Sequence, residues 1–324
     1  MARRYLGYKV ILGLAILGSL LALRLTTAPT LAAPKGMSGT IRISGAWALY
    51  PMVVQWGNEF HKLHPNVRVD VQAGGAGKGA ADALGGLVDI GMVSRDIHPA
   101  EIKKGGLGVP VVKDAVIVTA SAANPLAKDV TTHGLKRATF AALWMEGASL
   151  TWGQALNSTK RAGPVRVYTR SDACGAAETW AKYLGGKQED LEGTAVYGDP
   201  GVADAVRKDA LGIGYNNLNF AYDARTGRPV AGLIIVPIDI NGNGKLDKDE
   251  NFYRTKAQLT NAIASGVYPS PPARDLYLLT KGKPRGVTAE FIRWILTDGQ
   301  KYVDGTGYIQ LPQAKLNEGL KKLK

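Results

Sequence analysis

The stretch Tyr168-Thr-Arg-Ser-Asp-Ala-Cys-Gly-Ala-Ala-Glu-Thr-Trp180 decides the fold of this chain, because a strand turns into a helix inside it. Valines alternate just before Tyr168, as they do at the end of a β-strand. Apolar residues then recur at the spacing of one helix face, namely Ala177, Trp180, Ala181 and Leu184. Gly185 is expected to end that helix. The turn from strand to helix therefore falls near Gly175.

A permanently charged side chain, Arg170, lies just before this helix. The first N–H groups of a helix have no partner within it, and the helix dipole adds partial positive charge there. Arginine adds a planar set of donors that matches a tetrahedral oxyanion. The combination predicts an anion site. The alternative is a capped helix beside a surface arginine.

The composition is that of a globular protein large enough for two lobes, with 324 residues, 45% hydrophobic and 21% charged. The formal net charge of +13 suits an anionic ligand or an acidic surface. Nucleic acid is not expected as a partner, because the basic residues are dispersed along the sequence. The single cysteine, Cys174, excludes an internal disulfide and a cysteine-rich metal site.

Residues 1–32 have the pattern of a secretory signal peptide. Basic residues at positions 3, 4 and 9 precede the apolar stretch Val10–Leu23, and Thr30-Leu-Ala32 offers small residues for a cleavage site. This apolar stretch is short for a membrane span, although an uncleaved N-terminal anchor is the alternative. We therefore expect the protein to work in the periplasm or at the cell exterior.

Three earlier segments repeat the pattern of a strand that runs into a glycine-bearing or polar turn. They are Thr40–Ser44 before Gly45, Val67–Val71 before Gly74–Gly79, and Asp89–Val93 before Ser94-Arg95-Asp96. Alternating β and α segments predict an α/β protein with a mostly parallel sheet and ligands outside the carboxyl ends of its strands. Further strands are expected over Leu211–Phe220 and Leu233–Ile238, and a helix over Phe252–Ala264.

An ordered set of short motifs carries a family resemblance. The motifs are Ile43-Ser-Gly-Ala, Tyr50-Pro51, Gly74–Gly79, Asp89-Ile-Gly-Met-Val-Ser-Arg95, Trp152-Gly153, Arg170-Ser-Asp172, Gly212-Ile-Gly-Tyr215, Tyr268-Pro, Arg274-Asp-Leu-Tyr277, Asp298-Gly-Gln300 and Gly307-Tyr308. Together they span essentially all of residues 38–312. In this order they resemble the phosphate-binding proteins of bacterial phosphate ABC transporters.

The resemblance implies a two-lobed periplasmic-binding-protein type II fold, with mixed, mostly parallel sheets flanked by helices and two hinge crossings. Val111–Ala120 and Arg274–Leu279 would be the crossings. Residues 38–113 and 275–324 would form one lobe, and residues 118–270 the other. The anion would lie in the cleft between the lobes.

The resemblance also implies which residues contact the anion. Arg170 matches the family's phosphate-binding arginine, Asp172 the carboxylate that orients it, and Gly175 a backbone N–H donor. Asp96 is the nearest match to the acid that receives the phosphate proton, with Ser94 and Arg95 as rivals for that role. The family's hydroxyl residues are replaced here at Leu49, Ala76, Cys174 and Ala176. The full set of expected ligand-binding residues is Leu49, Tyr50, Ala76, Gly77, Ser94, Arg95, Asp96, Arg170, Asp172, Cys174, Gly175 and Ala176.

A family member of this kind captures phosphate, or a similar oxyanion, and delivers it to an ABC transporter permease without a catalytic step. We expect a monomer. One alternative is a cysteine-dependent hydrolase, because Cys174 at a helix N-terminus near Arg170 is expected to favour the thiolate. None of the four histidines, His61, His64, His98 and His133, is expected to pair with that thiol. The other alternative is a secreted binding or adhesion protein that keeps the fold without transport.

Residues 239–250 match the calcium loop D-x-[DN]-x-[DN]-G-x5-E at every position. The ligand positions of that loop are Asp239, Asn241, Asn243, Lys245, Asp247 and Glu250, with Lys245 offering its backbone carbonyl. Gly244 permits the sharp turn at the sixth position. A structural Ca²⁺ ion is therefore expected, the alternative being a polar hairpin tip.

Overall fold

The computed structural model describes residues 36–324, of which Met37–Lys324 form one compact unit. The expected signal peptide or anchor at residues 1–32 lies outside the described residues. Within the part of the chain that is described, none of the helices has the length and apolar character to cross a membrane.

The first elements alternate strictly between strand and helix. They are β1 (Gly39–Gly45), α1 (Tyr50–Leu63), β2 (Val67–Ala73), α2 (Ala76–Gly85), β3 (Ile90–Val93) and α3 (Pro99–Lys103). The long strand β4 (Gly106–Ser121) follows and leads into the middle of the chain. Pro51 lies in the first turn of α1, where its missing N–H costs nothing.

The middle of the chain holds most of the remaining elements. They are α4 (Ala127–His133), β5 (Leu135–Lys136), α5 (Arg137–Trp144), α6 (Trp152–Ala155), β6 (Arg166–Arg170), α7 (Gly175–Leu184), η1 (Gln188–Asp190), β7 (Thr194–Val196), α8 (Gly198–Lys208), β8 (Gly212–Asn217), α9 (Leu218–Ala221), β9 (Leu233–Ile235), β10 (Ile238–Asp239) and α10 (Lys256–Ala264). The chain then returns through β11 (Ala273–Lys281) and closes with α11 (Gly286–Leu296), η2 (Asp298–Tyr302), η3 (Asp304–Thr306) and α12 (Gln313–Lys322).

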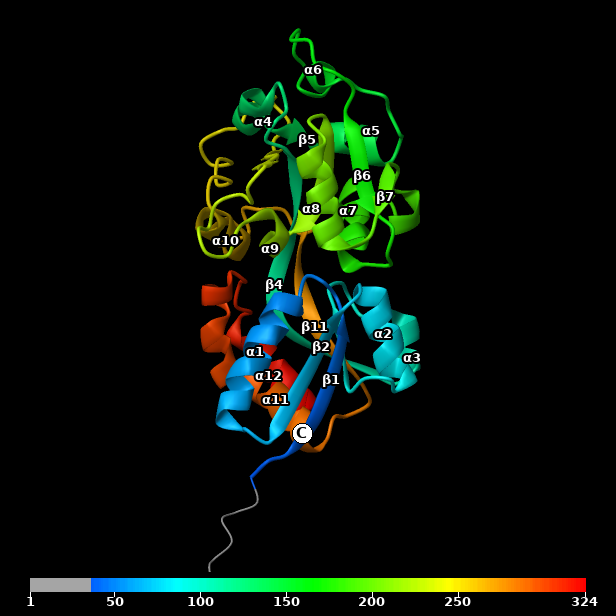
Figure 1. Ribbon diagram of the computed structural model, residues 1–324, viewed down its shortest axis with the longest axis vertical. Helices are drawn as coiled ribbons and strands as arrows, with labels where there is room; N and C mark the ends of the chain where they lie inside the picture. Colours follow the sequence, from blue (N-terminus) through cyan, green and yellow to red (C-terminus); the bar gives the residue numbers. More distant parts are fainter. Residues whose placement is uncertain (1–35) are drawn as a thin grey trace, which may run out of the picture. The chain divides into compact units, whose positions relative to one another are not determined.

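One mixed sheet runs through the described residues in the order β2-β1-β3-β11-β4-β8-β6-β7, with β9 paired to β4. The pairs β1–β2, β1–β3, β6–β7 and β6–β8 are parallel, whereas β4 and β11 are antiparallel to each other. Figure 1 shows β4 and β11 running side by side through the middle of this order. The expected α/β fold with two crossing strands is therefore confirmed.

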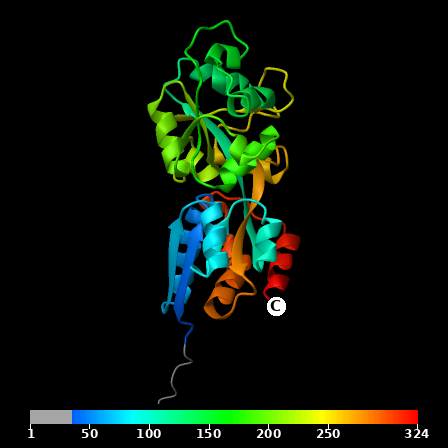
Figure 2. The ribbon, with the colours of Figure 1, turned by 90° about the vertical axis from the view of Figure 1, so that its right-hand side faces the viewer.

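The two largest hydrophobic clusters divide the sheet, and β4 contributes to both. Its residues up to Val112 pack with Trp56, Phe60 and Phe291 in the first cluster. We call the half of the sheet around this cluster, with its helices, lobe 1. From Ala115 onward β4 packs in the second cluster, and we call the half of the sheet around it, with its helices, lobe 2. Figure 2 shows the helices that cover each half of the sheet.

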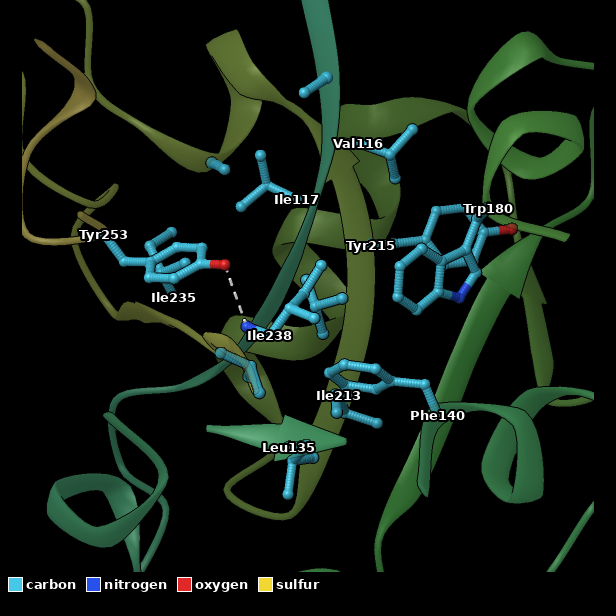
Figure 3. Packing of buried hydrophobic residues seen from close by; sticks show 14 of the residues in the cluster. Val116, Ile117, Leu135, Phe140, Trp180, Ile213, Tyr215, Ile235, Ile238 and Tyr253 are labelled. Atoms are coloured by element: carbon cyan, nitrogen blue, oxygen red, sulfur yellow. Dashed lines mark hydrogen bonds between the residues drawn. The ribbon is translucent and has the colours of Figure 1, made fainter. Parts of the chain in front are cut away.

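Aromatic rings fill the core of lobe 2 beside β4. The Trp180 ring lies 5.3 Å from that of Phe140 and 6.1 Å from that of Tyr215, measured between centroids. Figure 3 shows these rings on one side of β4, and Tyr253 on the other side accepting a hydrogen bond from the Ile238 N–H. Trp180 belongs to α7, so burial of this ring fixes the helix whose start was predicted to bind an anion.

Two expected strands are shorter than the sequence suggested. The strand predicted over Leu211–Phe220 ends at Asn217, and residues 218–221 form the helical turn α9, which buries Leu218 and Ala221. The strand predicted over Leu233–Ile238 breaks at Pro237, which cannot donate to a strand ladder. The helix predicted over Phe252–Ala264 begins only at Lys256, because the Thr255 side chain caps it.

Candidate functional site

Arg170 ends β6, and its guanidinium is fully buried. It donates to Asp172 through Nε and Nη2, at 2.7 and 2.6 Å, and to Asp199 Oδ2 through Nη1, at 2.6 Å. Burial works to lower the pKa of Arg170, but the charges of Asp199 and Asp172 outweigh it and raise the pKa. The alternative of a surface arginine is wrong. The side chain is a permanent buried cation.

Asp199 belongs to the candidate site through its ion pair with Arg170, and the sequence analysis did not predict it. It lies in the first turn of α8, is fully buried, and accepts from the backbone N–H and the side-chain amide of Asn217, at 2.7 and 2.8 Å. Gly198, just before it, donates to Asp172 at 3.2 Å. A signal was present, because Gly198 and Asp199 begin a helix directly after a short strand, and Arg170 likewise lies where a strand leads into a helix.

The start of α7 supplies buried N–H donors. Cys174 is the N-cap residue, and its Sγ accepts from the Ala177 N–H at 3.4 Å. The N–H groups of Gly175 and Ala176, both buried, make no hydrogen bond within residues 36–324. Two free donors therefore remain at this helix N-terminus, in the part of the chain that carries Arg170.

Lobe 1 meets the same helix start through close backbone contacts. The Gly77 N–H donates to the Ala173 carbonyl at 3.0 Å, which joins the two lobes. A Cβ added at Gly175 would collide with the Ser94 carbonyl, so only glycine fits there. Leu49 and Ala76 are fully buried and offer no polar side-chain atom, and Tyr50 begins α1 half-buried.

The expected proton acceptor, Asp96, and its rival Arg95 have partners other than Arg170, Asp172 and Asp199. The side chain of Asp96 is 76% exposed and pairs with Lys182 at 3.4 Å. Arg95 is buried, but it pairs with Glu101 at 2.7 Å and, across the lobes, with Glu178 at 3.1 Å. These two side chains therefore form a bridge between lobes. They do not join the carboxylates around Arg170.

Cys174 is not prone to form a thiolate. Burial raises the pKa of its thiol to about 12, because desolvation outweighs the attraction of Arg170. The expectation drawn from the helix N-terminus is wrong, since that argument holds for a partly exposed sulfur. The His98 Nε2 lies 3.0 Å from Glu178, and no hydrogen bond joins His98 to the Cys174 thiol within the described residues.

The loop 239–250 is held by its own carboxylates. Asp239 is buried and accepts from the N–H groups of Gly242 and Gly244, at 2.8 and 2.7 Å. Glu250 is buried and accepts from the Asn241 N–H at 2.9 Å. The amides of Asn241 and Asn243 donate to Asp247, at 2.8 and 2.7 Å. Within residues 36–324, no three His, Cys, Asp or Glu side chains are grouped as metal ligands, so a calcium site would depend on the amide and carbonyl oxygens as well.

Comparison with known proteins agrees with this fold. A family model described as PBP superfamily domain matches residues 31–299. The phosphate-binding protein PstS of Xylella fastidiosa strain Temecula1 is 26% identical over 315 residues, covering 84% of this chain and 82% of that protein. The PstS protein of Bacillus subtilis strain 168 is also 26% identical, covering 86% of this chain and 83% of that protein.

Solved structures add the same fold at lower sequence identity. A protein of Clostridium perfringens, solved with bound phosphate, superimposes with a TM-score of 0.68 at 19% identity. The match covers 85% of this chain and 100% of that one. The resemblance expected from the ordered motifs is confirmed, and the chain belongs to the PBP superfamily.

Proposed function

We propose that this protein binds inorganic phosphate, or a closely related tetrahedral oxyanion, at Arg170 between its two lobes. One observation carries the proposal. A fully buried guanidinium lies in the same strand-to-helix turn as two buried N–H groups, those of Gly175 and Ala176, that have no partner within the described residues. Buried donors of this kind are costly unless a ligand accepts from them.

The hydrogen-bond donors around the site also determine the affinity and selectivity that we expect for the anion. Hydroxyl donors are absent at Leu49, Ala76, Cys174 and Ala176, and each missing hydrogen bond to a charged group is worth about 1.5–3 kcal/mol. We therefore expect weaker binding than a hydroxyl-rich site would give. Two buried carboxylates already surround Arg170, so an oxyanion that carries a proton to donate is favoured over a fully ionised one.

The proposed role is delivery of this anion to an ABC transporter permease by an extracytoplasmic, monomeric protein without a catalytic step. The support is the family membership and the phosphate-binding relatives. Closure of two lobes about crossing strands is a general way for such proteins to hold a ligand and signal its presence. The buried, protonated thiol of Cys174 offers no support for the hydrolase alternative.

We also propose that the loop 239–250 binds Ca²⁺ as a structural ion. The chemistry of the donors fits, since Asp239, Asp247 and Glu250 offer carboxylates and Asn241 and Asn243 offer amide oxygens. The two amides would have to release Asp247 and turn their oxygens inward. A strand pair precedes this loop where an EF-hand has a helix, so the ion would hold the loop in place and not open it.

A thermal-shift screen tests the anion proposal. The purified protein is heated with phosphate, arsenate, sulfate, molybdate or small organic acids at constant ionic strength. Phosphate and arsenate are expected to raise the melting temperature, because a ligand that binds only the native state stabilises it. A rise with an organic acid alone would assign the site to a different ligand.

A further inference from the structure

Arg274 lies near the start of β11, in one of the two strands shared by the lobes, and its side chain is buried. Its Nε donates to the Ser94 carbonyl at 2.9 Å, at the end of β3 in lobe 1. Its Nη2 donates to the side-chain oxygen of Asn217, at the end of β8 in lobe 2. One guanidinium thus spans strand ends of both lobes.

The contact with Asn217 continues to the anion site. Asn217 donates twice to Asp199, at 2.7 and 2.8 Å, and Asp199 accepts from Arg170 at 2.6 Å. Every side chain in this series is buried. Hydrogen bonds that involve charged groups in a buried site are strong and directional, so the position of one member constrains the next.

The hydrogen bonds, and not an ion pair, fix the orientation of Arg274. Its Nη1 has no hydrogen-bond partner within the described residues and lies 3.8 Å from the Asp114 carboxylate. That distance gives a charge interaction but no preferred angle. The two directed bonds through Nε and Nη2 require the planar arrangement of an arginine, which a lysine does not have.

We propose that Arg274 is a positioning residue of the anion site. It holds Asn217 against the end of β3, Asn217 holds Asp199, and Asp199 keeps Arg170 in one orientation. Arg274 does not touch the anion itself. The expected effect of Arg274 on phosphate affinity rests on the proposed function. Its effect on the orientation of Arg170 does not, because that effect is present without a ligand.

The test compares Arg274→Lys and Asn217→Ala with Arg285→Lys, which changes an exposed arginine at the start of α11. Two quantities are measured on folded protein: phosphate affinity by calorimetry, and hydrogen exchange of the Arg170 Nε–H by NMR without phosphate. Arg274→Lys is expected to weaken phosphate binding at least tenfold and to speed this exchange at least tenfold. Arg285→Lys is expected to change neither quantity more than twofold.

A double variant separates positioning from general support of the fold. If Arg274 acts through Asn217, then Arg274→Lys adds less than twofold to either effect in the Asn217→Ala background. The proposal is overturned if the effects of the two substitutions multiply in the double variant. It is also overturned if folded Arg274→Lys exchanges the Arg170 Nε–H at the wild-type rate. If Arg274→Lys does not fold, Asn217→Ala alone must still speed the exchange. If the wild-type protein does not bind phosphate, the proposed function is refuted. The exchange rate of the Arg170 Nε–H in the variants would still decide the role of Arg274.

Discussion

Two pairs of buried carboxylates in lobe 2 have different kinds of partner. Asp172 and Asp199 share the guanidinium of Arg170. Asp239 and Glu250 are equally buried, but within residues 36–324 they accept only backbone N–H groups and pair with no Lys, Arg or His. A buried charge needs a counter-charge or several hydrogen bonds. Arg170 supplies positive charge to Asp172 and Asp199, so this pair needs no cation from solution. In the described part of the chain, Asp239 and Glu250 have no positively charged side chain beside them, so a bound cation could balance their charge.

Arg170→Ala should have the largest effect, because it leaves two buried carboxylates without their cation. Removing one partner of a buried ion pair costs about 3–5 kcal/mol, so the free energy of unfolding should fall by that order. Phosphate affinity should fall at least a hundredfold. Urea unfolding and equilibrium dialysis measure the two effects. Unchanged dialysis results in folded protein would remove Arg170 from the anion site.

Calcium should act on the other pair, and with a smaller effect. At a hundred times its dissociation constant, a bound ion stabilises the native state by about 2.7 kcal/mol. Calcium should therefore raise the melting temperature of the wild type, and a chelator should reverse the rise. Glu250→Gln should abolish the response, while Asp249→Asn, an exposed neighbour outside the ligand positions, should keep it. If calcium changes the melting temperatures of the two variants equally, the loop is only a turn and not a calcium site.

Another buried carboxylate, Asp114, lies 3.8 Å from Arg274 Nη1, too far for a hydrogen bond. It accepts no hydrogen bond of ordinary length within the described residues, and burial raises its pKa from 3.8 to about 6. The folded state then binds more protons than the unfolded state between these values, so stability falls as pH rises from about 4 to 6. The loss is up to about 3 kcal/mol. Asp114→Asn should remove this slope in urea unfolding at several pH values, and an unchanged slope would contradict the assignment.

Cys174 should show the smallest effect. Its thiol is buried and protonated, so a thiol reagent should react with it only when the native protein unfolds. Cys174→Ser restores a hydroxyl at the start of α7 and should keep or improve phosphate affinity, within about tenfold. Fast labelling of the native protein, or a hydrolytic activity that disappears in Cys174→Ser, would instead support the hydrolase alternative.

Local patterns predicted much of this molecule. The turn from β6 into α7 and its end at Gly185 follow from helix spacing and from glycine in a left-handed conformation. Asp199 was missed because its partner, Arg170, is 29 residues away and meets it only when β6 and α8 pack together. The error on Cys174 has the same origin. A helix N-terminus is visible in a sequence, but the burial that raises the pKa of the thiol depends on tertiary packing.

A calorimetric titration of the wild-type protein with phosphate, repeated with sulfate at equal ionic strength, tests whether Arg170 and its carboxylates form a phosphate site. Both ions are tetrahedral, but only phosphate carries a proton near neutral pH to donate to the carboxylates around Arg170. We expect saturable binding of one phosphate per chain, with sulfate at least tenfold weaker. No saturable phosphate heat, or equal affinity for the two ions, would contradict it.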